Sequence, residues 1–149
     1  MRLRLYLDTS VISAYVDERL PERQRATLEF WERLGGYDVA ISELTLTEAR
    51  ATWDIALRQR MVDLVNGFLV LPVGEEARQL AREYVGRGVF SAATALDALH
   101  VAIAVAARQD MLVSWNFRHL VNRRRRALVN EVNSLAGYPA IEILAPPEV

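Results

Sequence analysis

The chain has 149 residues, of which 52% are hydrophobic and 25% are charged, and its formal net charge is −1 at pH 7. This composition predicts a single folded domain over residues 1–149, and it excludes a disordered chain or a strongly basic protein that only coats nucleic acid. The chain has no cysteine, which excludes disulfides, thiolate metal sites and thiol catalysis.

The strands and helices expected from the sequence alternate along the whole chain. Strand 3–7 stops at Asp8, and a helix begins there because Thr9 and Ser10 are good N-cap residues. The further expected strands are 38–41, 68–71, 111–114 and 140–144. The further expected helices are 23–34, 42–51, 53–66, 75–85, 92–107, 117–121 and 124–135. This alternation predicts an α/β fold with three layers, in which a mainly parallel sheet of about five strands carries helices on both faces.

No segment has the pattern of a membrane span or an export signal. The N-terminal apolar run is too short and interrupted for a signal peptide, and no stretch approaches the roughly 20 apolar residues of a membrane helix. The longest run of low charge, 89–107, contains Asp97 and His100 and is better explained as a buried helix. We therefore expect a cytoplasmic protein with no membrane partner, and the lack of cysteine fits a reducing compartment.

Four polar residues are expected near one edge of the sheet. In parallel sheets, ligands bind beyond the carboxyl ends of the strands. Asp8 and Asn116 follow the first and fourth expected strands. Glu48 lies in the helix after the second strand, and Asp97 lies in the apolar helix that precedes the fourth. These residues are far apart in sequence, but the expected fold can bring them together.

Three carboxylates in one pocket predict a cation. They repel one another at low dielectric, and at least one pKa would rise if no cation were present. Mg²⁺ or Mn²⁺ prefers such oxygen ligands, so we expect Asp8, Glu48 and Asp97 to hold one of these ions, with Asn116 completing the catalytic set. Such an ion binds phosphate oxygens and activates water, which makes a phosphodiester the expected substrate.

Ordinary structural roles compete with these assignments. Asp8 and Ser10 are also suitable helix caps, and Ser10 could instead orient Asp8 and a metal-bound water. Glu48 and the nearby Glu43 would ordinarily be solvated helix residues. For Asp97 the functional role is favoured over a structural one, because burying an unpaired carboxylate in so apolar a helix costs several kcal/mol.

Two histidines and the arginines have two interpretations each. His100 lies one turn from Asp97 and could orient an acidic ligand, or it could be a satisfied buried histidine. His119 and Arg118 could contact the substrate phosphate, or they could lie on a solvated turn. The block Arg123–Arg126 could bind RNA backbone. On a helix these side chains diverge by about 100° each, so only one or two could face one ligand.

Four segments resemble, in order, the motifs of PIN-domain nucleases. Residues 7–13 (LDTSVIS) resemble the first motif, a strand that ends in Asp followed by Thr or Ser. Residues 41–48 (ISELTLTE) resemble the second, a Ser followed six residues later by the acidic ligand, which selects Glu48 over Glu43. Residues 96–104 (LDALHVAIA) resemble the third. Residues 112–120 (LVSWNFRHL) and the tail 137–148 are similar to a subgroup with Trp-Asn in the fourth motif.

This resemblance implies a PIN-like fold, a Mg²⁺ or Mn²⁺ site, and hydrolysis of RNA phosphodiester bonds. It also implies a VapC-type toxin of a toxin–antitoxin pair, which forms homodimers and is inhibited by its antitoxin. One departure from the family is that Asn116 stands where many PIN domains have Asp. An amide oxygen can bind a metal or its water but brings no charge, so a second tightly held ion is doubtful.

Other functions fit the sequence less well. A phosphotransferase of the haloacid dehalogenase type needs a second Asp where Ser10 stands, and a receiver domain needs paired acids and a late lysine. A non-catalytic or weakly active PIN-fold module that binds RNA or protein remains an alternative because of Asn116. Apolar residues of helices 23–34 and 53–66, such as Phe30, Trp31, Trp53 and Leu57, are assigned to the core, with a dimer or antitoxin groove as the alternative.

Overall fold

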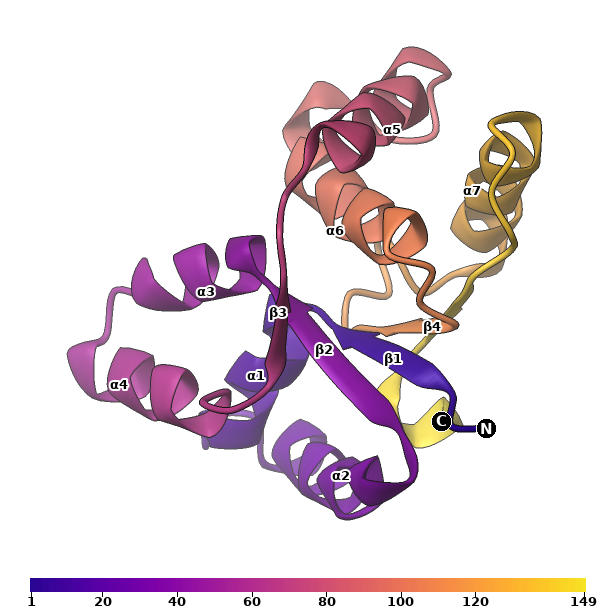
Figure 1. The fold of residues 1–149 in the computed structure, drawn as a ribbon. Coiled ribbons are helices and arrows are strands. Elements are labelled where there is room, and N and C mark those ends of the chain that lie inside the picture. The colour runs from indigo at the N-terminus through magenta and orange to yellow at the C-terminus, as the bar shows by residue number, and fades with distance from the viewer.

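A computed structural model describes all 149 residues and contains one sheet of five parallel strands (Figure 1). The order across the sheet is β3-β2-β1-β4-β5, so β1 is the central strand. This arrangement confirms the predicted α/β fold with a five-stranded parallel sheet. The strands are β1 (Arg4–Leu7), β2 (Asp38–Ser42), β3 (Leu69–Leu71), β4 (Met111–Val113) and β5 (Glu142–Leu144).

Seven α-helices cover the two faces of the sheet. Helices α1 to α4 lie on one side and α5 to α7 on the other, as Figure 1 shows. The helices are α1 (Thr9–Val16), α2 (Pro21–Glu32), α3 (Glu43–Arg50), α4 (Ile55–Leu64), α5 (Glu75–Gly86), α6 (Ala95–Ala106) and α7 (Arg123–Leu135). Three short 3₁₀ helices complete the fold, at Leu34–Gly36, Ala92–Thr94 and Pro146–Glu148. None of the helices is long and apolar enough to cross a membrane.

The order of the strands creates a switch point between β1 and β4. From β1 the chain builds outward through β2 to β3, and it then returns to the other side of β1 to add β4 and β5. Ligands in open parallel sheets bind at the carboxyl ends of the strands at such a point. In-register pairing of Leu7 with Val113 fixes how the segments that follow these two strands meet.

The core depends on β1 and α6. Leu5, Tyr6 and Leu7 are fully buried, as expected for a central strand covered on both faces. In α6 the run His100–Val105 is buried throughout, which agrees with the expectation of a buried apolar helix.

The expected helix at 117–121 is wrong, because this segment is a turn. The Asn116 side chain accepts a hydrogen bond from the His119 backbone, and the Asn116 carbonyl accepts from both Leu120 and Val121. Asn122 is then extended and caps α7 through its side chain, which accepts from the Arg125 backbone. Local hydrogen bonds from asparagine side chains therefore replace the helical pattern at this point.

Candidate active site at the carboxyl edge of the sheet

Asp8 lies directly after β1 and is only 5% exposed. Its Oδ1 accepts hydrogen bonds from the Ser10 backbone (3.0 Å) and the Ser10 hydroxyl (2.5 Å). Its Oδ2 accepts from the Ser114 hydroxyl at 2.5 Å, across the switch point. The side chain is therefore the N-cap of α1 and, at the same time, the link between the segments that follow β1 and β4.

Glu48 lies on α3 and is bound by residues from two other elements. Its Oε1 accepts from the Thr9 hydroxyl at 2.6 Å and lies 2.5 Å from Nε2 of His100. Since a carboxylate only accepts, Nε2 of His100 carries the proton in this pair. These contacts place Glu48 beside α1 and α6, although it is about 40 residues from one and 50 from the other.

Tyr6 and Ser42 hold His100 from the opposite side. The Tyr6 hydroxyl lies 2.6 Å from Nδ1 of His100 and 2.8 Å from the Ser42 hydroxyl. Burial raises the pKa of Tyr6, so this phenol keeps its proton and can donate it to Nδ1. The imidazole thus bridges a fixed phenol on the central strand and the carboxylate of Glu48. Such bridging fixes the ring and the carboxylate it contacts.

Asp97 is in the first turn of α6, where an acidic side chain is favoured by the helix dipole. It is half-buried, and its Oδ1 accepts a long hydrogen bond of 3.4 Å from the Asn116 amide. The Asn116 backbone in turn donates to the Ser114 hydroxyl at 2.9 Å. Asp97 is therefore connected to Asp8 through the segment after β4.

The other residues predicted for the site are Ser10, His119 and Arg118, and only some of them contact or influence the carboxylates. Ser10 is part of the network, and its hydroxyl also accepts from the Trp115 backbone at 2.8 Å. His119 faces the cluster closely enough to lower the pKa of Asp97. Arg118 is exposed and makes no hydrogen bond through its guanidinium. Glu43 is exposed, which agrees with the preference for Glu48.

The charges of the cluster are only partly balanced. Burial is the main cause that raises the pKa of Asp8, although His100 and two hydroxyls act against it. Burial also raises the pKa of Asp97, and the nearby charge of Glu48 adds to this rise. Burial would raise the pKa of Glu48 as well, but the hydrogen bond and charge of His100 and the bond from Thr9 outweigh it and lower that pKa.

The donor atoms of the cluster suit a hard cation, but they do not form a ready set of ligands. No three acidic or histidine side chains stand in an arrangement that could hold a metal ion directly. The second carboxylate oxygens of Glu48 and Asp97 have no hydrogen-bond partner in the protein, so they are free to accept one. A Mg²⁺-type ion usually retains several waters, and water can span the gaps between such oxygens.

Asn116 has a different surrounding from the three acids. Its amide nitrogen faces Asp97, and its amide oxygen accepts from the His119 backbone at 2.9 Å. The oxygen that could reach a metal is therefore already engaged. In this structure Asn116 positions Asp97 and the turn after β4.

Sequence reasoning missed three residues of the network: Tyr6, Thr9 and Ser114. Tyr6 is a polar residue in the centre of a fully buried strand, and this position was an available signal. Thr9 and Ser114 adjoin predicted motif residues, but nothing in the sequence shows that their hydroxyls bond to Glu48 and Asp8.

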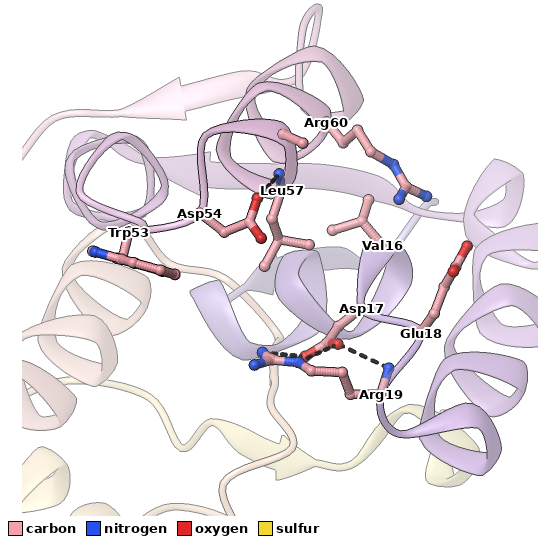
Figure 2. A pocket seen from close by; sticks show the side chains of 9 residues that line it. Val16, Asp17, Glu18, Arg19, Trp53, Asp54, Leu57 and Arg60 are labelled. Atoms are coloured by element: carbon pink, nitrogen blue, oxygen red, sulfur yellow. Dashed lines mark hydrogen bonds and ion pairs between the residues drawn. The ribbon is translucent and has the colours of Figure 1, made fainter.

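A second hollow lies away from these carboxylates, between the end of α1 and the start of α4 (Figure 2). It has a volume of about 250 Å³, and none of its lining residues belongs to the network. Trp53 on its rim is 91% exposed, whereas Phe30 of α2 is fully buried. The assignment of apolar residues to the core is thus correct for Phe30 and wrong for Trp53, because Trp53 lies in the exposed connection between α3 and α4.

The sequence profile of the PIN domain family matches residues 5–120, which include every residue of the network. This chain belongs to the PIN domain family. No curated protein sequence matches it significantly. The match agrees with the predicted family and with the three-layer fold.

Several solved structures share the fold at low sequence identity. VapBC2 from Rickettsia felis, bound to a DNA fragment from its promoter, is 14% identical with a TM-score of 0.62 over 96% of this chain and 98% of that one. The sarcin-ricin loop cleaving toxin VapC20 from Mycobacterium tuberculosis is 16% identical with a TM-score of 0.60 over 93% and 98%. VapBC-5 from M. tuberculosis is 20% identical with a TM-score of 0.54 over 95% and 98%.

The raised pKa of Asp97 predicts how stability depends on pH. Because the folded-state pKa lies above the unfolded one, stability is highest below the ordinary aspartate pKa and falls as pH rises through the raised value. In EDTA, Asp97→Asn should therefore melt at a higher temperature than the wild type at pH 7, by up to about 2–4 °C. The melting temperature of Asp97→Asn should also fall less than that of the wild type between pH 4 and neutral pH.

Thermal unfolding followed by circular dichroism from acid to neutral pH measures this effect. Asp63→Asn, an exposed aspartate on α4, makes the same chemical change and should leave the profile unaltered. Equal melting temperatures for Asp97→Asn and the wild type at neutral pH would show that Asp97 carries no unfavourable charge.

Proposed function

We propose that this PIN domain is a Mg²⁺- or Mn²⁺-dependent endoribonuclease that acts as the toxin of a toxin–antitoxin pair. The observation that carries this proposal is that two hydrogen-bonded networks meet at the switch point of the sheet. One joins Asp8 to Asp97 through Ser114 and Asn116, and the other holds Glu48 through His100 and through Thr9, the residue after Asp8. Carboxylates that gather at the carboxyl edge of a parallel sheet, with two pKa values raised, are typical of a catalytic site.

Asp8, Glu48 and Asp97 would hold the ion. When bound, the ion would polarise the phosphate and supply an activated water. Asp8 is kept in place by Ser10 and Ser114, so its carboxylate cannot turn away from the cluster. His100 and Thr9 hold one oxygen of Glu48 and leave the other free. His119 adds positive character beside Asp97, where the substrate phosphate would approach.

The partners in this proposal are RNA, an antitoxin protein and a second copy of the chain. The similar VapBC structures support an antitoxin, and the exposed Trp53 at the hollow of Figure 2 supports a protein partner. The homodimer is carried by the resemblance to VapC-type toxins. Light scattering of the purified protein would contradict the dimer if it gave the 16.9 kDa mass of one chain.

A PIN-fold module that binds RNA or protein without cutting it is the second candidate. Two observations favour it: the amide of Asn116 replaces an acid, and no three acidic side chains form a ready set of ligands. The two functions differ in a single measurable property, which is metal-dependent cleavage.

We expect the purified protein to cleave RNA in Mg²⁺ or Mn²⁺ and to lose this activity in EDTA. Asp97→Asn should reduce cleavage by at least about 100-fold, because it removes a charge from the metal site. Total RNA, a pool of random single-stranded RNA and DNA of the same sequences are suitable substrates. Asp63→Asn is the matched control and should cleave normally. Binding of RNA without any cleavage in either metal would support the non-catalytic module.

Tyr6→Phe tests the support behind Glu48. Loss of the phenol leaves Nδ1 of His100 without its partner while the contact with Glu48 remains, so we expect about tenfold lower activity and a higher metal concentration for half-maximal cleavage. Tyr84→Phe is a matched control, because Tyr84 is also a buried tyrosine, bonded to Asn133 away from the site. Both variants should lose similar stability. Equal activity losses in the two would show that Tyr6 acts only through folding.

A further inference from the structure

A basic hollow lies next to Asp97 and plays no part in the site described so far. It has a volume of about 570 Å³ and is bounded by the turn after β4, the loop after α5 and the first turns of α7. Arg118, Arg124 and Arg125 line it, together with Phe117, and none of its lining residues is acidic. A cavity of this composition attracts anions.

Arg125 stacks on an aromatic ring and, like Arg126, keeps one buried nitrogen without a hydrogen-bond partner. Its guanidinium lies over the ring of Phe90, with 4.4 Å between Cζ and the ring centroid. Its Nη1 is buried without any hydrogen-bond partner, and the side chain makes no ion pair. The side chain is partly buried, and stacking on Phe90 stabilises its charge there. A guanidinium donor that is not engaged within the protein can donate to an anion.

The hollow is also close to the carboxylate cluster. Phe117 and Arg118 on its rim directly follow Asn116, whose side-chain amide donates to Oδ1 of Asp97 at 3.4 Å. Arg125 makes no ion pair with Asp97, so the hollow opens beside Asp97 without being filled by it. An anion in the hollow would therefore lie beside the point where the cluster would hold a phosphate to be cleaved.

Phe117 gives the hollow a second chemical character. It is 49% exposed although it is a large aromatic residue, and its neighbour Arg118 lies on the same rim. An exposed aromatic ring beside arginines is the combination that single-stranded nucleic acid requires, because bases stack on the ring while phosphates meet the cations.

We propose that this hollow binds a phosphate of single-stranded RNA next to the one that is cleaved, with Arg125 as its principal contact and Phe117 as the stacking surface for the adjoining base. This inference rests on the proposed ribonuclease function and adds the residues that would hold the neighbouring phosphate and base. Arg118 and Arg124 add charge at the rim. The block Arg123–Arg126 is thereby divided, since Arg123 and Arg126 line a different hollow.

The test compares Arg125→Gln with Arg123→Gln, which makes the same charge change on the same helix outside the hollow. Binding of a short labelled single-stranded RNA is measured by fluorescence anisotropy in EDTA over a series of KCl concentrations. For Arg125→Gln we expect about tenfold weaker binding and a decrease of about 0.7 in the slope of log K against log salt. Arg123→Gln should change the affinity and the salt slope much less.

In Mg²⁺, Arg125→Gln should raise KM for cleavage and leave kcat nearly unchanged.

Arg118→Gln and Phe117→Leu keep the test valid if Arg125→Gln unfolds, because both side chains are exposed. Arg118→Gln should lower the salt slope, and Phe117→Leu should weaken binding of unpaired RNA at an unchanged slope.

Equal effects of Arg125→Gln and Arg123→Gln, or equal affinity for duplex and unpaired RNA, would overturn the subsite. If the wild type cleaves RNA but Arg125 has no special effect, the subsite fails and the nuclease stands. If the Arg125 effect appears without any cleavage, the nuclease fails and the subsite stands.

Discussion

The parallel pairing of β1 with β4 is the constraint on which the candidate site depends. It sets Leu7 against Val113, so the chain leaves both strands at the same height. Asp8 and Ser114 then meet within hydrogen-bond distance, and Asn116 follows two residues later to reach Asp97. Glu48 enters from the far side of β1 through α3. Because β1 is central and buried on both faces, these groups share one rigid support, which is what a site that must hold charges at fixed distances requires.

The cluster is held mainly by hydroxyls and one imidazole rather than by arginine side chains. Hydroxyls of Thr9, Ser10 and Ser114 and the imidazole of His100 donate to the carboxylates, and no arginine pairs with them. Hydroxyl donors orient a carboxylate without cancelling its charge. The pKa values of Asp8 and Asp97 therefore stay raised, and a bound divalent cation would lower them by favouring the ionised carboxylates. Arg125, whose charge lowers the pKa of Asp97, makes no ion pair with the cluster and lines the basic hollow.

The fold class was predictable because strands and helices alternate with clear breaks, whereas the order of the strands became known only from the structure. Helix 117–121 failed because Asn116 and Asn122 bond to the nearby backbone, which hydrophobic periodicity does not reveal. Asp8 could be proposed from its position after the first strand and Asp97 from its place in an apolar helix, whereas the choice of Glu48 over Glu43 depended on the resemblance to the second PIN motif. The supporting contacts could not be predicted, since a hydroxyl on Thr9 or a phenol on Tyr6 acquires its role only when α3 and α6 pack against β1. The hollow at Arg125 likewise depends on how α7 leaves the turn after β4.

Anomalous diffraction from crystals grown with Mn²⁺ tests the central claim most directly, namely that Asp8, Glu48 and Asp97 together bind one divalent cation. The account predicts an anomalous peak between these three carboxylates, with waters completing its shell, and no such peak in crystals of Asp97→Asn. A cluster without a peak at saturating Mn²⁺, or an ion bound elsewhere while the three carboxylates keep their present hydrogen bonds, would contradict it.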